Sequence, residues 1–347
     1  MSGNIYIYYE FFKREFLSNL LLSVIASNKN FKVYIGTGKV YQFLLKKNLL
    51  KPGIFHTKSI THGSEKTNFH KKLKKKKFII TSIDQEHGVI DSGSFEDLFI
   101  KPRVNQKDLD LCDAYFCWGK FDFQNLRKNF KKTNIFFQTG SPRVDLWKKR
   151  FNILWKNNYI EHKNYILFIS NFSFCNNYYS FKEIMNRKKK EGYYKRSPNL
   201  KKEEIKYYKY QKKTLLKFAQ VIKKASKKFP NKIIYVRPHP TEKKEFWSKN
   251  LKNLKNVFIK DEKDISNYIN KAEVVIQNGC TSAVESYIRK IPVVNYLPVK
   301  SKNQVFGEFI KSFSLNIYTE KEIFNIIKNK NYKILKKKKL LTVECLF

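Results

Sequence analysis

Residues 233–242 of the chain read IIYVRPHPTE, an apolar run followed by an arginine and a histidine, each of which directly precedes a proline. Proline fixes its own φ, donates no backbone hydrogen bond and biases the preceding residue toward extended geometry. Arg237 and His239 are therefore held extended where a buried strand ends. One interpretation is a rigid platform for two cationic or proton-carrying side chains. The other is a strand that simply stops at prolines and leaves a histidine exposed.

Apolar runs of the same kind recur through the second half of the chain. They are nearly continuous in apolar residues, which is typical of parallel strands covered by helices on both faces. The runs are YILFIS at 165–170, KIIYVRP at 232–238, NVFIK at 256–260, EVVIQNG at 273–279 and PVVNYL at 292–297. Together with a long helix expected around 203–229, they predict a doubly wound domain at 165–335.

The first half of the chain shows the same alternation of short strands and helical patterns, which predicts a second doubly wound domain at 1–150. Its runs are NIYIYYE at 4–10, KVYIG at 32–36, FIITSI at 78–83, YFCWG at 115–119 and IFFQTG at 135–140. We expect an α/β fold in which two Rossmann-like domains face each other across a cleft at the carboxyl ends of their strands. The lysine-rich segment 176–200 is expected to be a long basic loop.

The charge of the chain is strongly positive, because 71 Lys and Arg face 29 Asp and Glu, for a net charge of +42. Clustered cations favour nucleic-acid binding through counterion release. Most of the excess is lysine, however, and it accompanies heavy use of Asn, Ile, Phe and Tyr, whose codons are rich in A and T. The composition therefore favours codon bias, with weak attraction to anionic membrane surfaces, over a nucleic-acid-binding role.

The spacing of the cysteines and the sequence of the N-terminus indicate in which cellular compartment the protein is expected. The 5 cysteines are scattered, with no CxxC pair, and fit reduced thiols of a cytoplasmic protein. The start, MSGNIYIYYEFFKREF, lacks the pattern of a signal peptide, and the apolar run at 16–26 is too short to span a bilayer. We expect a cytoplasmic protein that meets a membrane only peripherally.

The most informative motif is QNGCTSAVE at 277–285, where a strand runs into a glycine turn and a helix begins with small hydroxyl residues. Free backbone N–H groups and the positive helix end at Thr281 and Ser282 can hold a phosphate, and Glu285 can accept hydrogen bonds from a ribose. The alternative is an ordinary N-cap by Thr281 or Ser282 with capping-box support from Glu285.

A common sheet edge connects this motif with the opening stretch, because both follow strands of one predicted sheet. Arg237 or His239 can then bind the same phosphate, and a protonated His239 would stabilise a leaving diphosphate. The turn ISNFS at 169–173 adds Asn171 and Ser173 as donors to phosphate or sugar. These two are also ordinary turn residues, so a purely structural interpretation stays open.

In the N-terminal half, FIITSIDQEHGVID places Asp84, Glu86 and His87 directly after a buried strand. A carboxylate at such an edge is a natural general base for an acceptor hydroxyl, with Glu86 ahead of the other two. The alternative is a solvated turn. The motif TGSPRVD at 139–145 places Arg143 and Asp145 after the last strand of this half, where they pair with each other or reach the cleft.

Taken together, TGSPRVD, RPHPTE and QNGCTSAVES followed by IPVVNYLP resemble the bacterial surface carbohydrate biosynthesis proteins, which have a GT-B-type glycosyltransferase architecture. More distantly they resemble CDP-glycerol glycerophosphotransferases and capsule Kdo transferases. DQEHG looks like the acidic turn of that family, and ISNFSFCN like the turn that opens its second domain. The resemblance covers roughly residues 1–315.

This resemblance implies that His239 and Arg237 contact the phosphates of the donor, that Thr281 and Ser282 hold them, and that Glu285 takes the ribose. It also implies catalysis without a metal or other cofactor. Two features depart from the pattern. His87 stands where the family pattern has a small residue. The tail KILKKKKLLTVECLF stands where such proteins usually have a long final helix, which is the pattern expected of a truncation or frameshift.

We therefore expect a metal-independent transferase that moves a sugar or polyol phosphate from a nucleotide-sugar or CDP-polyol donor to a surface glycan or lipid-linked acceptor. The base would be Glu86 or Asp84. An alternative from another enzyme class is a nonhydrolysing nucleotide-sugar epimerase, which shares the two-domain plan and needs no acceptor. A basic RNA-binding protein is a third hypothesis, motivated by the charge alone.

Overall fold

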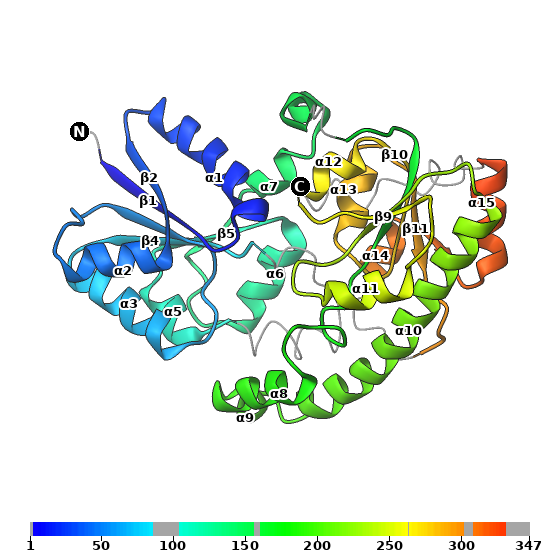
Figure 1. Cartoon of the computed structure of the whole chain (residues 1–347). Helices are drawn as coiled ribbons and strands as arrows, with labels where there is room; N and C mark the ends of the chain where they lie inside the picture. Colours follow the sequence, from blue (N-terminus) through cyan, green and yellow to red (C-terminus); the bar gives the residue numbers. More distant parts are fainter. Residues whose placement is uncertain (1–2, 86–103, 156–159, 263, 302–307, 331–347) are drawn as a thin grey trace. The chain divides into compact units, whose positions relative to one another are not determined.

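The computed structural model describes residues 3–85, 104–155, 160–262, 264–301 and 308–330. These residues form two compact units, each with its own parallel sheet (Figure 1). The N-terminal domain consists of the residues up to Leu146, and the C-terminal domain of nearly all residues from Trp147 on. The prediction of two doubly wound Rossmann-like α/β domains is confirmed, while the cleft between them stays a prediction.

The sheet of the N-terminal domain has six parallel strands in the order β2-β1-β3-β4-β5-β6. The strands are β1 (Asn4–Tyr9), β2 (Lys32–Thr37), β3 (Ile54–Thr57), β4 (Ile79–Ile83), β5 (Ala114–Cys117) and β6 (Phe136–Gln138). Since the chain leaves β1 for β2 on one side and places β3 on the other, the strand order reverses between β1 and β3. Open α/β sheets bind their ligands at the carboxyl ends of strands at such a switch point.

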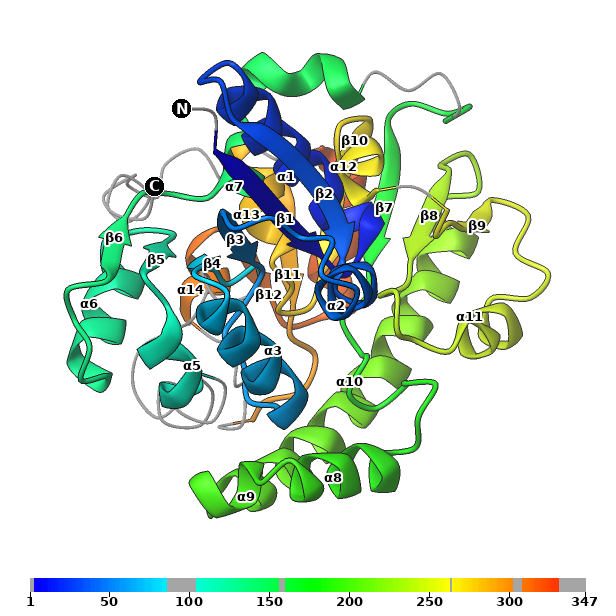
Figure 2. The ribbon, with the colours of Figure 1, turned by 90° about the vertical axis from the view of Figure 1, so that its left-hand side faces the viewer.

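Helices cover both faces of this sheet: α1 and α7 lie on one side, and α2, α3 and α5 on the other (Figures 1 and 2). The helices are α1 (Phe12–Ser27), α2 (Gly38–Lys46), α3 (Ser64–Lys75), α5 (Gln106–Leu111), α6 (Lys120–Asn129) and α7 (Pro142–Asp145). The core between the sheet and α2 and α3 holds buried Tyr6, Tyr41, Phe55, Leu73 and Phe78. Each such side chain contributes about 1.5–3 kcal/mol when it leaves water.

The C-terminal domain repeats the plan with six parallel strands in the order β12-β11-β10-β7-β8-β9. The strands are β7 (Tyr165–Ile169), β8 (Ile234–Arg237), β9 (Val257–Ile259), β10 (Ala272–Gln277), β11 (Val293–Tyr296) and β12 (Leu315–Ile317). Here the chain runs outward from β7 through β8 to β9 and then returns to the other side of β7. The switch point therefore lies between β7 and β10.

The described residues from Trp147 on form one 3-10 helix and eight α-helices, of which α9 straddles the boundary between the two units. They are η2 (Lys149–Trp155), α8 (Phe181–Lys190), α9 (Tyr193–Arg196), α10 (Leu200–Lys228), α11 (Lys244–Asn250), α12 (Ile265–Ile269), α13 (Ser282–Ile288), α14 (Glu308–Ser312) and α15 (Glu320–Asn329). None of the helices in the described part of the chain combines the length and apolar character needed to cross a bilayer.

The expected basic loop at 176–200 is wrong, because most of this segment forms α8 and α9. A capping box begins α8: the Ser180 hydroxyl accepts from the Glu183 N–H, and the Glu183 carboxylate accepts from the Ser180 N–H. These bonds satisfy N–H groups that have no partner inside the helix. The lysines at the end of the helix complement its negative dipole end.

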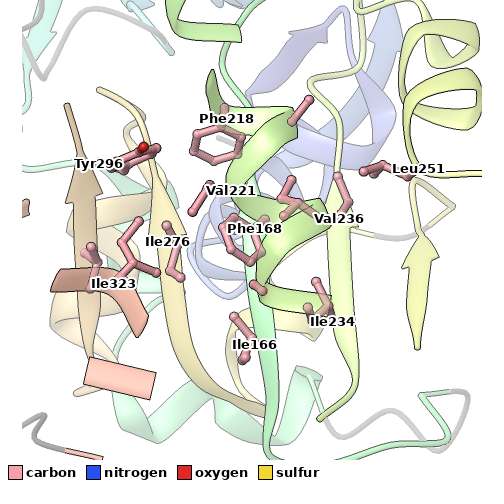
Figure 3. Packing of buried hydrophobic residues seen from close by; sticks show 14 of the residues in the cluster. Ile166, Phe168, Phe218, Val221, Ile234, Val236, Leu251, Ile276, Tyr296 and Ile323 are labelled. Carbon is pink, nitrogen blue, oxygen red and sulfur yellow. The ribbon is translucent and has the colours of Figure 1, made fainter. Parts of the chain in front are cut away.

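The core of the C-terminal domain lies between its sheet and α10 (Figure 3). Phe218, Val221 and Ile222 on α10 are fully buried. Figure 3 shows the facing residues Ile166 and Phe168 of β7, Ile234 and Val236 of β8, and Ile276 of β10. Because β7 stands at the centre of the sheet with apolar partners on both sides, the turn that follows it has a rigid base.

Candidate functional site

The switch point of the C-terminal domain is closed by a hydrogen bond between residues far apart in the sequence. The Asn171 side-chain amide, just after β7, donates to the carbonyl oxygen of Gly279, just after β10, at 2.9 Å. From the other side, the Gln211 amide on α10 donates to the Asn171 carbonyl oxygen at 2.9 Å. Asn171 is therefore fixed at the edge where this sheet class binds ligands, as the sequence predicted for its position. Ser173 lies two residues further on and is half-buried.

His239 occupies the neighbouring edge position, after β8, and its ring has a defined orientation. Nδ1 lies 3.3 Å from the Thr241 backbone nitrogen and 2.9 Å from the Thr241 hydroxyl. A backbone N–H can only donate, so Nδ1 is the acceptor, and we assign the proton of the neutral ring to Nε2. A ring held in this way presents Nε2–H as its donor.

Glu242, which the sequence analysis did not single out, organises these turns. The side chain is buried, with 1% of its surface exposed, and its two carboxylate oxygens accept from five donors. Burial raises the pKa of Glu242, and the hydrogen bonds from Phe172, Trp247 and Ser170 act in the opposite direction. The donors are the Ser170 hydroxyl (2.8 Å), the Phe172 N–H (2.8 Å), the Trp247 indole (2.9 Å), the Asn176 amide (3.4 Å) and the His239 N–H (3.4 Å).

Arg237 points into the protein from the last position of β8. Its guanidinium donates to the Lys260 carbonyl oxygen at 3.0 Å and lies 5.4 Å from the centre of the Tyr268 ring. Burial lowers the pKa of Arg237, and nearby Tyr268 and Asp261 oppose this effect. These contacts join the ends of β8 and β9 to α12. Its role as a phosphate ligand stays a prediction.

The glycine turn after β10 uses its backbone differently from the sequence expectation of free N–H groups. The Gly279 N–H donates to the Asn295 side chain at 3.1 Å, and the Cys280 N–H donates to the Gln277 side chain at 2.7 Å. Gly279 has a positive φ of 58°, which glycine adopts without strain. Side-chain amide oxygens therefore already bind these two N–H groups, and a phosphate contact by the N–H groups of Thr281 and Ser282 stays a prediction.

Thr281 and Ser282 follow directly at the start of α13. Thr281 occupies the N-cap position of α13 but makes no side-chain capping hydrogen bond, so the predicted alternative of a side-chain cap with capping-box support is not found at this residue. The Ser282 hydroxyl is buried and has no hydrogen-bond partner among the described residues. A buried hydroxyl without a partner calls for an explanation, and a bound ligand or water is one.

Glu285 lies one turn further along α13 in a buried ion pair. Its Oε1 accepts from the Arg289 Nε at 3.0 Å and from the Ser266 hydroxyl at 2.5 Å. The two charged side chains expose only 3% and 1% of their surface. Arg289 also donates to the side chains of Asn152 and Asn270. Glu285 therefore ties α13 to α12, and its contact with a ribose stays a prediction.

In the N-terminal domain, Asp84 is buried directly after β4, and its carbonyl oxygen accepts from the Trp118 indole at 2.8 Å. Asp122 on α6 is also buried and accepts from the Trp118 N–H at 3.3 Å. Burial raises the pKa of Asp122 to about 7, and the charge of Asp84 adds to this shift. Glu86 and His87, the other two predicted site residues of this turn, lie outside the described residues.

Arg143, on α7, donates to the Gln85 carbonyl oxygen at 3.1 Å, which places its guanidinium beside the turn after β4. Asp145 ends the same short helix. The role of both residues in binding stays a prediction. The turn itself continues the polar edge formed by Asp84.

A second charged group, missed in the sequence, lies at the switch point of this domain. Lys58, after β3, is buried and forms ion pairs with Glu10, after β1, and with Glu15 on α1 at 3.7 Å. Glu15 is fully buried and accepts from the N–H groups of Glu10 and Phe11 at 2.7 and 3.3 Å. No signal along the chain connects Lys58 with Glu10, because only the sheet order brings them together.

A metal centre is not found in the described ranges, which contain no group of three or more His, Cys, Asp and Glu that could hold an ion. The polar edges described above consist of amides, hydroxyls, one imidazole and ion pairs. Such groups bind by hydrogen bonding and charge.

No protein-family model matches the sequence, and no curated protein sequence matches it either. Solved structures do resemble the fold. The UDP-GlcNAc 2-epimerase from Methanocaldococcus jannaschii, in complex with UDP-GlcNAc and UDP, aligns with a TM-score of 0.57 at 15% identity, covering 98% of this chain and 94% of that one.

Two further structures give the same result. The UDP-GlcNAc 2-epimerase from Neisseria meningitidis, bound to UDP-GlcNAc, has a TM-score of 0.53 at 10% identity, over 97% of this chain and 94% of its own. The wall teichoic acid polymerase TagF has a TM-score of 0.52 at 11% identity, over 97% of this chain and 81% of its own. These likenesses show that the chain has the two-domain GT-B-type fold.

Proposed function

We propose that the chain is an enzyme that binds a nucleotide-activated sugar at the switch point of its C-terminal domain and epimerises the sugar. The observation that carries the proposal is the convergence at one sheet edge of Asn171, His239 and Ser282, which follow three strands of the fold. A fixed amide, an imidazole with a defined proton and an unpartnered hydroxyl suit the oxygens of a diphosphate.

The charge of the protein supports an anionic substrate, because a net charge of +42 attracts phosphates over the whole surface. At the edge itself, His239 would donate from Nε2 to a phosphate oxygen and hold the diphosphate of the bound sugar nucleotide. Thr281, which is exposed, would contribute its hydroxyl beside the Ser282 hydroxyl. Arg237 and Glu285 would keep the turns of the site in place through their contacts with Lys260, Tyr268, Ser266 and Arg289.

Epimerisation is supported by the likeness in fold to the UDP-GlcNAc 2-epimerases, of which two were solved with UDP-GlcNAc. Inverting a carbon centre requires one group that removes a proton and another that returns one. Two neighbouring carboxyl groups with different pKa values are a common solution. Asp84 and Asp122 of the N-terminal domain are candidate groups for this step, since burial raises the pKa of Asp122 to about 7 and the charge of Asp84 adds to the shift. Glu86 is the further candidate base that the sequence provides.

A second candidate is the transferase predicted from the sequence motifs, with a glycan or lipid-linked acceptor. The likeness to TagF, solved with CDPG, supports it. Both candidates use a nucleotide-activated substrate and differ in whether an acceptor is needed. The cytoplasmic location and the contact with an anionic membrane stay predictions from the sequence, and binding of RNA has no further support.

The test is turnover without an acceptor. Purified protein is incubated with UDP-GlcNAc and, separately, with other UDP-, CDP- and GDP-sugars, and the sugar protons are followed by NMR. An epimerase yields a second sugar nucleotide with an inverted centre, while a transferase leaves the substrate unchanged until a glycan acceptor is added. Binding is measured in parallel by calorimetry, with His239→Ala as the control. Absence of binding to every nucleotide would overturn both candidates.

A further inference from the structure

The carboxylate of Glu242 connects the turns after β7 and β8, which hold the proposed phosphate-binding residues Asn171 and His239. On the β7 side it accepts from the Ser170 hydroxyl and the Phe172 N–H, which flank Asn171 in the chain. On the β8 side it accepts from the N–H of His239, at 3.4 Å. The turns are also joined by a backbone bond from the Ser170 N–H to the Arg237 carbonyl oxygen at 3.0 Å.

We propose that Glu242 is a positioning residue that sets the His239 ring and the Asn171 amide for the phosphates of the nucleotide, an inference that rests on the proposed function. Glu242 lies under the turns and is 99% buried, since 1% of its surface is exposed. It therefore acts through the turns and touches no substrate. A group that orients binding residues by hydrogen bonds in this way fixes their geometry before the ligand arrives.

Only a carboxylate satisfies this arrangement, because all five neighbours donate and an ionised carboxylate only accepts. In Glu242→Gln the side chain keeps its size but carries an NH₂ group at one of the two positions. That group would face the Trp247 indole on one side or the Phe172 N–H on the other, and two donors repel each other. One of the two turns must then shift.

The experiment compares the full-length protein with Glu242→Gln in two measurements. The first is the dissociation constant for UDP, CDP and GDP by calorimetry. The second is the long-range ¹H–¹⁵N spectrum of the histidine rings, in which His239 is assigned by its absence in His239→Ala. The wild type should show His239 with an unprotonated Nδ1 and a protonated Nε2 at pH 8.

For Glu242→Gln we expect the nucleotide to bind about tenfold to a hundredfold more weakly, as small displacements of positioned groups do. The His239 signals should move toward the averaged tautomers of a free imidazole. The matched control is Glu204→Gln, which also removes a buried carboxylate of this domain. Glu204 accepts hydrogen bonds from Lys188 and Tyr194, and all three residues are far in sequence from both turns. It should leave affinity and spectrum unchanged.

The outcomes separate this inference from the proposed function. If the wild type binds a nucleotide and Glu242→Gln binds it equally well with an unchanged His239 spectrum, the inference is wrong. If the wild type binds no nucleotide, the proposed function fails, and the spectrum alone decides whether Glu242 orients His239. Should Glu242→Gln fail to fold, Ser170→Ala, which removes one of the donors, replaces it in both measurements. An unchanged affinity and spectrum in a folded Ser170→Ala would then overturn the inference.

Discussion

Replacing Glu285 by alanine should destabilise the C-terminal domain, because it leaves the Arg289 guanidinium buried without its carboxylate. The two side chains expose 3% and 1% of their surface, so water cannot replace the lost partner. The Ser266 hydroxyl loses its acceptor in the same step. This prediction separates a structural Glu285 from the ribose ligand expected from the sequence.

The size of the effect follows from the contacts that remain. Removing one partner of a buried ion pair costs about 3–5 kcal/mol. Arg289 keeps hydrogen bonds to Asn152 at 3.1 Å and Asn270 at 2.8 Å, which places the loss near the lower end, at about 3 kcal/mol. In a domain of this size each kcal/mol moves the unfolding midpoint by about 2–4 °C, so a shift of roughly 6–12 °C is expected.

The assay is calorimetric unfolding together with urea denaturation at pH 7.5, for Glu285→Ala, Arg289→Met and the double variant Glu285→Leu/Arg289→Met. The double variant should recover most of the lost stability, because replacing a whole buried pair by apolar side chains is often neutral. A Glu285→Ala protein within about 0.5 kcal/mol of the wild type would refute this reasoning. Loss of nucleotide affinity in such a stable variant would favour the ribose contact instead.

Three further variants test the N-terminal domain. Because burial raises the pKa of Asp122 from 3.8 to about 7, the folded state holds a proton that the unfolded state releases, and stability falls as pH rises through this window. Asp122→Asn should flatten the fall and add up to about 4 kcal/mol at pH 8, measured by urea unfolding across pH. Burial lowers the pKa of His56 from 6.5 to about 4, so the folded state loses stability as pH falls through that range. His56→Phe should remove this loss, which is up to about 3 kcal/mol, in the same titration. If the dependence of stability on pH is unchanged in either variant, the pKa shift of the replaced residue is contradicted. Gly53→Ala would place a Cβ 2.4 Å from the Asn4 carbonyl oxygen, and we expect a loss of about 1–3 kcal/mol by urea denaturation, whereas a neutral result would show that the β1–β3 pair can separate.

The architecture was predictable from the sequence because the strands are short, apolar and nearly continuous. IYV before Arg237 and VVIQ before Asn278 are buried throughout, as is typical of a parallel sheet covered on both faces. The same periodicity placed the polar turns at one edge. The order of the strands within each sheet was not readable, since it depends on contacts between distant segments.

Strand β3 and helix α8 were not predicted, because their residue composition is not typical of a strand or a helix. Strand β3 has the sequence IFHT, in which a histidine and a threonine stand where apolar residues are expected. His56 is nevertheless buried, with its ring hydrogen-bonded to the Thr81 hydroxyl and close to the Phe116 ring. Helix α8 was hidden by its lysines, although the pattern Ser180-x-x-Glu183 is a capping-box signal that would have found it.

The candidate site was predictable as a location and less so as a set of contacts. Arg237 and Glu285 were expected to reach a ligand, and both are bound within the protein by partners that the sequence does not indicate, apart from Arg289 four residues after Glu285. Glu242 was missed for the same reason. Its principal donors lie about seventy residues earlier, and only the pairing of β7 with β8 brings them near.

The central place of β7 also determines the order in which the C-terminal domain can be completed during synthesis. Its partner on one side, β8, begins only at Ile234, after the long helix α10, and the partner on the other side, β10, begins later still, at Ala272. Until then one edge of the apolar strand Tyr165–Ile169 has no partner strand, and such an edge readily pairs with another chain. Nascent chains that stall between β9 and β10 should therefore be the aggregating species, and chaperones that bind extended apolar segments should associate with the protein during this interval.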